Sequence, residues 1–255
     1  MEKFTLEAHS TLRLVLCNEL VLVLEISLVP LEIQLRMIYR LTDSVIEMLK
    51  NVFPDVFENA EGSERDDTDI LLYGFDDDES EIKYCWSQIK KSNEMRPSDI
   101  FSVLFTGSDA VLKFVTIIAE SEGIPNWSLS KNTFGKLNYG RLNNYFDQHN
   151  LPLMYVGNGY GSLSEAAEDN KIVLTTYYSA KGLDFDYVYL PFVNDPLPAK
   201  GNESQLMLVA LSRSKNELWI SYSGELSSDI APFLEDIEVI DPFSIESDDN
   251  DDQLF

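Results

Sequence analysis

The sequence predicts an α/β fold in which a mostly parallel sheet is flanked by helices. Short apolar runs alternate along the chain with segments of helical periodicity, a pattern typical of a doubly wound sheet. The chain has 255 residues, which is enough for one large α/β domain or two small ones with a buried core. Hydrophobic residues make up 44% and aromatic residues 11%, so the composition is that of a folded protein.

The first segment, residues 1–34, is dominated by the apolar run LRLVLCNELVLVLEISLVPL (Leu12–Leu31). Arg13, Glu19 and Glu25 interrupt this run. Each charge at the centre of a membrane-spanning helix costs roughly 3 kcal/mol, so we do not expect a membrane span. We expect a buried helix or a strand pair, which is either a remnant of a larger protein or a packing element.

The main domain is expected over residues 35–240, and its first helix follows the N-cap residues Thr42 and Asp43, because apolar residues then recur at helical spacing. The acid-rich stretches within residues 55–81 are expected to be solvated loops, and residues 241–255 a disordered acidic tail. The other predicted elements are, in order, an edge strand at DILLYGF (69–75), a helix at EIKYCWSQIKKS (81–92), a buried strand at DIFSVLFTG (99–107), a helix at DAVLKFVTIIAESEG that Gly123 ends (109–123), a strand at LPLMYVGNG (151–159), a short helix at SLSEAAED (162–169), strands at KIVLTTYY (171–178) and DYVYLPFV (186–193), a helix at ESQLMLVALSRSK (203–215) and a strand at ELWISYSG (217–224).

The composition counts against autonomous DNA binding, against a metal site and against a catalytic triad. The formal net charge is -25, from 19 Lys and Arg against 44 Asp and Glu, which counts against a protein that binds DNA on its own. The cysteines, Cys17 and Cys85, match no metal-ligand spacing, and two histidines, His9 and His149, offer little to a zinc site or a catalytic triad. No secretion signal is evident, so we expect a reducing cytoplasm.

Two glycine-containing segments raise the question of nucleotide binding. VGNGYGS (156–162) follows a predicted strand and opens a helix, as a dinucleotide-binding loop does, but Ser162 replaces the third glycine, so a tight turn is the favoured interpretation. A phosphate loop of the pattern G-x-x-x-x-G-K-[ST] is absent from the sequence. At its one Gly-Lys pair, Gly135-Lys136, Leu137 follows and Ser130 replaces the first glycine.

The segment TTYYSAKGLDFDYVYLP (175–191) places a Lys-Gly corner between two predicted strands. This corner is either a simple turn or a loop that contacts nucleotide or nucleic acid. A second segment, QLMLVALSRSKNELWIS (205–221), brings Arg213 directly before a buried strand, and we expect this arginine at the carboxyl rim of the sheet, where ligands of such sheets bind. An arginine there could supply charge to a transferring phosphate.

Together these two segments resemble consecutive motifs of the UvrD/Rep-type superfamily 1 helicases. The family patterns are T-x-H-S-A-K-G-L-E-F-x-x-V-x-L-P and E-x-x-L-x-Y-V-A-x-T-R-A-x-x-x-L-x-I, in the same order and setting. LRMIYRLTDSVI (35–46) is a weaker match to the family pattern L-x-x-N-Y-R-S-x-x-x-I. All three motifs belong to the second RecA-like domain of the family, so the resemblance implies that fold, with a mostly parallel sheet between helices.

The resemblance implies nucleotide-facing roles for three residues. Arg213 matches the arginine that reaches the γ-phosphate of ATP, and Arg40 matches another arginine directed at the same phosphate. Asp184 stands where the family has a glutamate that contacts the nucleotide sugar, and it is one methylene shorter. ATP with Mg²⁺ is therefore the implied cofactor, with the metal ligands supplied by a first domain that carries the phosphate loop.

The same resemblance implies a loop that couples the nucleotide to a single strand of DNA. Ser179, Lys181 and Gly182 match this loop, and Thr176 matches a hydroxyl that contacts the strand. Tyr178 replaces the usual histidine, although a tyrosine can still stack on a base. Leu208 and Ile38 replace a tyrosine and an asparagine of the family patterns, and Gln205 stands where the family has an arginine.

Three functions follow as hypotheses. The first is the second motor domain of a DNA helicase, present as a fragment, a split subunit or a remnant, inactive alone and binding single-stranded DNA weakly or only in a complex with the phosphate-loop domain. The second is a non-enzymatic, helicase-derived regulatory or protein-interaction module, which the acidic charge and tail would suit. The third, a dinucleotide-dependent enzyme that uses VGNGYGS, has the least support.

Overall fold

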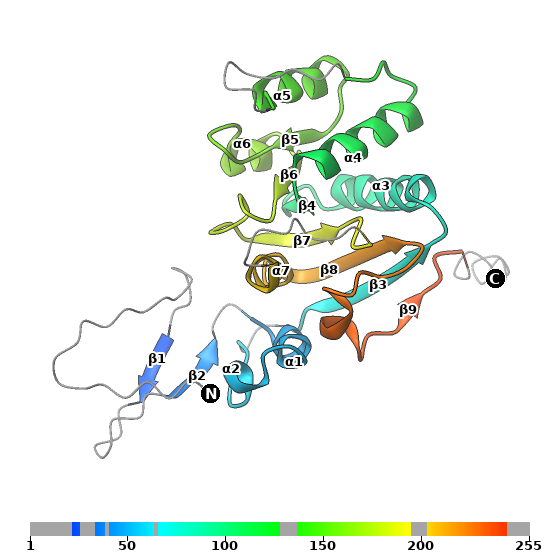
Figure 1. Cartoon of the computed structure of the whole chain (residues 1–255). Coiled ribbons are helices and arrows are strands. Elements are labelled where there is room, and N and C mark those ends of the chain that lie inside the picture. The colour runs from blue at the N-terminus through cyan, green and yellow to red at the C-terminus, as the bar shows by residue number, and fades with distance from the viewer. Residues whose placement is uncertain are drawn as a thin grey trace, which may run out of the picture.

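The computed structural model describes residues 22–25, 34–38, 41–63, 66–127, 137–194 and 203–243, with backbone alone for the first two ranges and for residues 203–205. The main body is a seven-stranded sheet in the order β5-β6-β4-β7-β8-β3-β9, which can be followed from top to bottom in Figure 1. All of its pairings are parallel. The strands are β3 (Asp69–Phe75), β4 (Phe101–Phe105), β5 (Leu153–Tyr155), β6 (Ile172–Thr176), β7 (Phe185–Leu190), β8 (Ser214–Ser223) and β9 (Val239–Ile240). The predicted fold class is therefore confirmed.

Helices cover both faces of the sheet, so that two hydrophobic cores form. One core joins the sheet to α1, α2, α6, α7 and η1, and the other joins it to α3, α4 and α5. The connections that move along the sheet toward β5 use one face and those that move back use the other, as right-handed crossovers require. The helices are α1 (Asp43–Lys50), α2 (Pro54–Phe57), α3 (Asp78–Met95), α4 (Ser108–Ser121), α5 (Tyr139–Gln148), α6 (Leu163–Glu168), α7 (Glu203–Leu211) and the 3₁₀ helix η1 (Ala231–Leu234).

The start of α1 agrees with the prediction, but a different residue satisfies its backbone. Thr42 is the N-cap, yet its hydroxyl accepts no hydrogen bond from a backbone N–H of the helix. Asp67 instead accepts the N–H of Ser44 at 3.0 Å and its hydroxyl at 2.8 Å. Burial raises the pKa of Asp67, but the hydrogen bonds from Ser44 and Thr68 outweigh it and hold this pKa below its ordinary value.

The predicted end of α4 is confirmed, but the predicted position of β3 in the sheet is not. Gly123, just beyond the end of α4, has a φ of 67°, a conformation that glycine adopts without strain, so the predicted stop is confirmed. The prediction that 69–75 is an edge strand is wrong. β3 lies between β8 and β9, because Leu72 and Tyr73 pair with Val239 and Ile240.

The helix α5 and the strand β9 were not expected from the sequence. The segment of α5, YGRLNNYFDQ, contains a glycine and two asparagines, which are poor helix formers. Burial of Leu142 and Phe146 against β5 stabilises the helix in spite of this composition. β9 is only two residues long and carries no periodicity.

The N-terminal segment is described in part. Residues 22–25 form β1 (Leu22–Glu25), which pairs antiparallel with β2 (Gln34–Ile38), so a strand pair is observed here rather than a helix. The remainder of the apolar run and most of the predicted acidic tail lie outside the described residues. Among the helices that the structure describes, none is both long and apolar enough to cross a membrane.

Candidate functional site

The predicted site residues lie at two opposite edges of the sheet. Thr176 is the last residue of β6, at the carboxyl edge, whereas Asp184 and Arg213 directly precede β7 and β8, at the amino edge. Residues 177–184 connect the two edges without a helix. The expectation that Arg213 lies at the carboxyl rim is therefore wrong, because a residue that immediately precedes a parallel strand lies at the amino end of that strand.

At the carboxyl edge, the end of β6 turns sharply around a threonine hydroxyl. Oγ1 of Thr176 accepts the N–H of Ser179 at 3.3 Å and donates to its hydroxyl at 3.1 Å. The carbonyl of Thr176 accepts the N–H of Ala180 at 2.8 Å. This turn buries Tyr177 in the core and leaves the next side chain, Tyr178, 76% exposed. The exposed ring therefore presents an aromatic face at this edge, as base stacking requires.

The glycine-rich turn after β5 packs directly against this loop. Gly157 and Tyr160 exchange two backbone hydrogen bonds of 2.9 Å, and Asn158 and Gly159 between them have φ values of 52° and 81°, as a type I′ turn needs. A Cβ at Gly157 would lie 2.6 Å from Cβ of Ser179. The segment VGNGYGS is thus a tight turn whose glycine permits close approach to the Ser179 loop.

The middle of the connection is the Lys-Gly corner. Gly182 has a φ of 91°, which only glycine adopts readily, so this residue sets the direction of the chain toward β7. Lys181 is exposed, and the N–H of Leu183 donates to the carbonyl of Ala180 at 3.0 Å. The corner therefore has a defined shape and presents a cation to solvent.

At the amino edge, the Arg213 guanidinium lies between the last turn of α7 and the end of the connecting loop. Its Nε donates to the carbonyl of Val209 at 2.8 Å, and Nη1 donates to the carbonyl of Leu183 at 3.2 Å. Nη2 donates to the hydroxyl of Ser212 at 3.3 Å, and the whole residue is only 6% exposed. The carbonyl of Arg213 accepts the N–H of Phe185 at 3.1 Å. These bonds fix the orientation of the guanidinium and join the two predicted motifs.

The structure gives less information on Asp184 and Arg40, the other two residues that were predicted to face a nucleotide. Asp184 is partly exposed and is the neighbour of Leu183, so it shares the amino edge with Arg213. Arg40 lies outside the described residues. The segment that follows it, beginning with buried Leu41 and Thr42, starts α1 on the same face of the sheet as α7.

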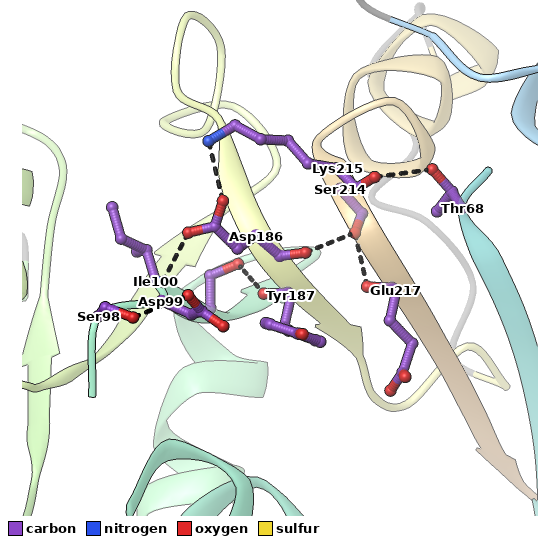
Figure 2. A network of polar contacts seen from close by, with 10 residues as sticks. Thr68, Ser98, Asp99, Ile100, Asp186, Tyr187, Ser214, Lys215 and Glu217 are labelled. Carbon is purple, nitrogen blue, oxygen red and sulfur yellow. Dashed lines mark hydrogen bonds and ion pairs between the residues drawn. The ribbon is translucent and has the colours of Figure 1, made fainter. Parts of the chain in front are cut away.

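A polar network at the amino edge was not predicted from the sequence. The Asp186 carboxylate accepts the N–H of Ile100 at 2.8 Å and pairs with Nζ of Lys215 at 3.0 Å, as Figure 2 shows. The hydroxyl of Thr68 donates to the carbonyl of Lys215 at 3.1 Å. The members of this network come from segments far apart in the sequence, and no local pattern indicates such long-range contacts.

Comparison with protein families gives a match over residues 150–225, to the UvrD-like helicase C-terminal domain. The chain carries a UvrD-like helicase C-terminal domain. The match contains β5 to β8 and each predicted site residue except Arg40, and it confirms the resemblance on which these residues were selected. Less than a third of the chain lies within the matched range.

The solved structures that are similar to the chain include the following two. One is the C-terminal domain of a possible DNA helicase from Lactobacillus plantarum WCFS1, with 17% identity, a TM-score of 0.44, and coverage of 76% of this chain and 93% of that one. The other is the helicase domain of Hef from Pyrococcus furiosus, with 12% identity, a TM-score of 0.38, and coverage of 68% and 34%. No curated protein sequence matches the chain.

Proposed function

We propose that this UvrD-like helicase C-terminal domain acts as the second motor domain of an ATP-dependent superfamily 1 DNA helicase. The observation that carries the proposal is the connection over residues 177–184. One end of it holds the exposed Tyr178 beside Thr176, and the other end accepts a hydrogen bond from Arg213 through Leu183. A single short loop thus joins a surface suited to a DNA strand with a guanidinium suited to a phosphate.

The chemistry assigned to this chain is charge stabilisation from one side of the nucleotide. The Arg213 guanidinium carries a fixed charge and several N–H donors, which match the charge that develops on a transferring phosphoryl group. Arginines in this role contribute about 10³–10⁵ in rate. The hydrogen bonds to Val209 and Leu183 orient the group before the reaction, so little reorganisation is needed in the transition state.

The residues present fit a nucleotide from this one side only. The 255-residue sequence contains no phosphate loop, so binding of the phosphates and Mg²⁺ requires a first RecA-like domain, in the same polypeptide or in another. Mg²⁺, when bound there, would neutralise charge on the phosphates. Arg213, Arg40 and Asp184 would complete the cleft from this domain.

Single-stranded DNA is the proposed partner at the carboxyl edge. Stacking of a base on an aromatic side chain contributes about 1–3 kcal/mol, and Tyr178 offers such a face. The net charge of -25 opposes strong binding by this chain alone, so we expect DNA binding only in the complete motor. The same charge favours a second candidate function, a non-enzymatic module that binds a basic protein partner.

The test begins with ATP turnover by the full chain, with and without single-stranded DNA, and with capture of partners from the lysate of its host. We expect no turnover by the chain alone and recovery of a protein that contains a phosphate loop. In the completed motor, meaning the full chain together with that phosphate-loop domain, Arg213→Ala should lower turnover by about 10³-fold. Arg141→Ala, which removes an exposed arginine on α5, is the control and should leave turnover unchanged.

Because Arg213 is buried, the thermal midpoint of each variant must be measured beside its turnover. Arg213→Lys preserves the charge and removes the planar guanidinium, so it separates the effect of the charge from that of the guanidinium geometry. Full turnover in a folded Arg213→Ala variant would refute the motor role. Absence of a phosphate-loop partner would favour the regulatory module instead.

A further inference from the structure

Asp184 and Arg213 lie at the amino edge, and the polar network there joins the segments that follow them to the segment that begins at Leu41, directly after Arg40. Thr42 follows Arg40 by two residues, Asp186 follows Asp184 by two, and Lys215 follows Arg213 by two. The network thus meets all three segments at the same distance along the chain from the residue that would face the nucleotide.

A relay of two hydroxyl groups joins the first of these segments to the third. The hydroxyl of Thr42 donates to Oγ1 of Thr68 at 2.8 Å, and the hydroxyl of Thr68 donates to the carbonyl of Lys215 at 3.1 Å. Thr42 is 1% exposed and Thr68 is 2% exposed, so water does not compete for these bonds. Ser44 reinforces the contact, because its hydroxyl lies 2.7 Å from the carbonyl of Thr68 and shares its one hydrogen between this carbonyl and Asp67.

The relay ends on a carbonyl that belongs to an irregular part of β8. Phe185 of β7 pairs with Ser214, but Tyr187 pairs with Glu217, so β8 holds one extra residue at this point and forms a β-bulge. A bulge leaves backbone groups without their ladder partners. The Thr68 hydroxyl satisfies the carbonyl of Lys215, and the Ser214 hydroxyl bonds the carbonyl of Glu217 at 2.5 Å.

The second segment is held by the Asp186 carboxylate, which stands between β4 and β8 in Figure 2. One oxygen accepts the N–H of Ile100, directly before β4, and the other pairs with Nζ of Lys215 across the bulge. Asp186 and Ile100 also share a backbone bond of 3.0 Å, from the N–H of Asp186 to the carbonyl of Ile100. The start of β7 is therefore fixed to both of its neighbours.

We propose that Thr68 is a positioning residue, whose hydroxyl holds the segment that follows Arg40, from Leu41 onward, in register with the Arg213 segment across the amino edge. This inference rests on the proposed function for its consequence in catalysis, but the linkage between the two segments can be tested without it. Displacement of a charged group by about 1 Å can reduce a rate by about 10²-fold, so a hydroxyl remote from the nucleotide can matter for turnover.

Two substitutions at Thr68 separate the hydroxyl from the shape of the side chain. Thr68→Val keeps the volume and removes the relay, whereas Thr68→Ser keeps the relay and removes a methyl group. Thr175→Val is the matched control, because Thr175 is fully buried and its hydroxyl has no hydrogen-bond partner among the described residues. Thermal midpoints are measured for all three variants, so that a change in global stability is accounted for.

The first experiment is hydrogen exchange on the full chain alone. Thr68→Val should accelerate exchange about tenfold in peptides that cover 41–50 and 206–217, because a buried donor and a buried acceptor lose their partner. Hydrogen exchange in peptides from α4, on the other face of the sheet, should not change beyond what the change in global stability explains. Thr68→Ser and Thr175→Val should resemble the unmodified chain. Unchanged exchange in either of the two segments of Thr68→Val would overturn the inference.

The second experiment measures ATP turnover by the completed motor. Thr68→Val should reduce kcat about tenfold or more with little change in KM, because an arginine that acts in the transition state is displaced. Thr68→Ser should restore kcat. In the Arg213→Lys background, Thr68→Val should cause no additional loss of kcat. An unrelated structural defect would instead lower kcat further than Arg213→Lys does alone.

The outcomes distinguish the inference from the function on which it rests. If Arg213→Ala abolishes turnover and Thr68→Val leaves kcat unchanged, the positioning role is overturned and the motor role stands. If Arg213→Ala has no effect, the motor role fails, and the exchange experiment alone decides whether Thr68 joins the two segments.

Discussion

Glu81 on α3 should make the stability of this domain depend on pH in the neutral range. The side chain is fully buried, and Oε1 accepts the N–H of Phe192 at 2.9 Å and the hydroxyl of Ser221. Oε2 has no hydrogen-bond partner among the described residues. Burial raises the pKa of this carboxyl from 4.5 to about 7, although the bonds from Phe192 and Ser221 and the charge of Lys113 lower it, while the charge of Asp78 raises it further.

The sign and size of the effect follow from this shift. Between pH 4.5 and pH 7 the folded chain holds a proton on Glu81 that the unfolded chain releases, so the free energy of unfolding falls as pH rises. A shift from 4.5 to about 7, at about 1.4 kcal/mol for each pH unit, corresponds to a loss of roughly 3 kcal/mol that is complete above pH 7.

Glu81→Gln tests this reasoning, because the amide cannot titrate and its oxygen can still accept the two hydrogen bonds. Urea unfolding of the full chain at several pH values between 4.5 and 8 gives the free energy of unfolding for both proteins. The difference between them should change by roughly 3 kcal/mol across this range, in favour of the glutamine variant at high pH. Glu94→Gln, an exposed position on the same helix, is the control for the change in net charge. Parallel pH profiles for Glu81→Gln and the unmodified chain would refute the argument.

Two further substitutions probe the packing around the carboxyl edge. Gly157→Ala should destabilise the fold by about 1–3 kcal/mol and accelerate hydrogen exchange around Ser179, because the added Cβ meets this residue and φ is 142°. Gly159→Ala is the control, because Gly159 also has a positive φ but an added Cβ there would have no atom within 4 Å. An equal loss of the free energy of unfolding in both variants, measured with urea, would contradict the proposed contact. Asn143→Ala should cost about 1–3 kcal/mol by the same measurement, because the Asn143 amide donates to the carbonyl of Tyr155 at 3.0 Å and accepts its N–H at 2.7 Å on the open edge of β5. An unchanged midpoint for Asn143→Ala would show that this edge needs no protection.

The strands that the sequence indicates most clearly are those whose burial is continuous along the chain. β4 and β6 are buried at every position, and their apolar runs mark them clearly. The helix α5 was not predicted, because tertiary packing of Leu142 and Phe146 overrides a composition that disfavours helices. The interior position of β3 in the sheet was not predicted either, since the strand β9 that covers its outer edge is only two residues long.

The candidate site was predicted as a set of residues but not as a geometry. The motif spacing assigned Thr176, Tyr178 and Arg213 to one helicase C-terminal domain, and the family match over residues 150–225 contains all three. The assignment of Arg213 to the carboxyl rim was wrong, although its position directly before a parallel strand was enough to place it at the amino edge. The link from Thr42 to Thr68 spans 26 residues, and nothing local in the sequence indicates it.

The length of the connection between β6 and β7 has a mechanical consequence. A sheet with strands of this length is roughly 15–20 Å from edge to edge, and eight extended residues reach at most about 29 Å. The turn that follows Thr176 and the corner at Gly182 shorten the reach of the connection, so that it exceeds the width of the sheet by little. The connection therefore has little slack, and it behaves as a tether of nearly fixed length. A strand of DNA that displaced Tyr178 outward would draw on the chain at Leu183, and thereby on the carbonyl that orients the Arg213 guanidinium.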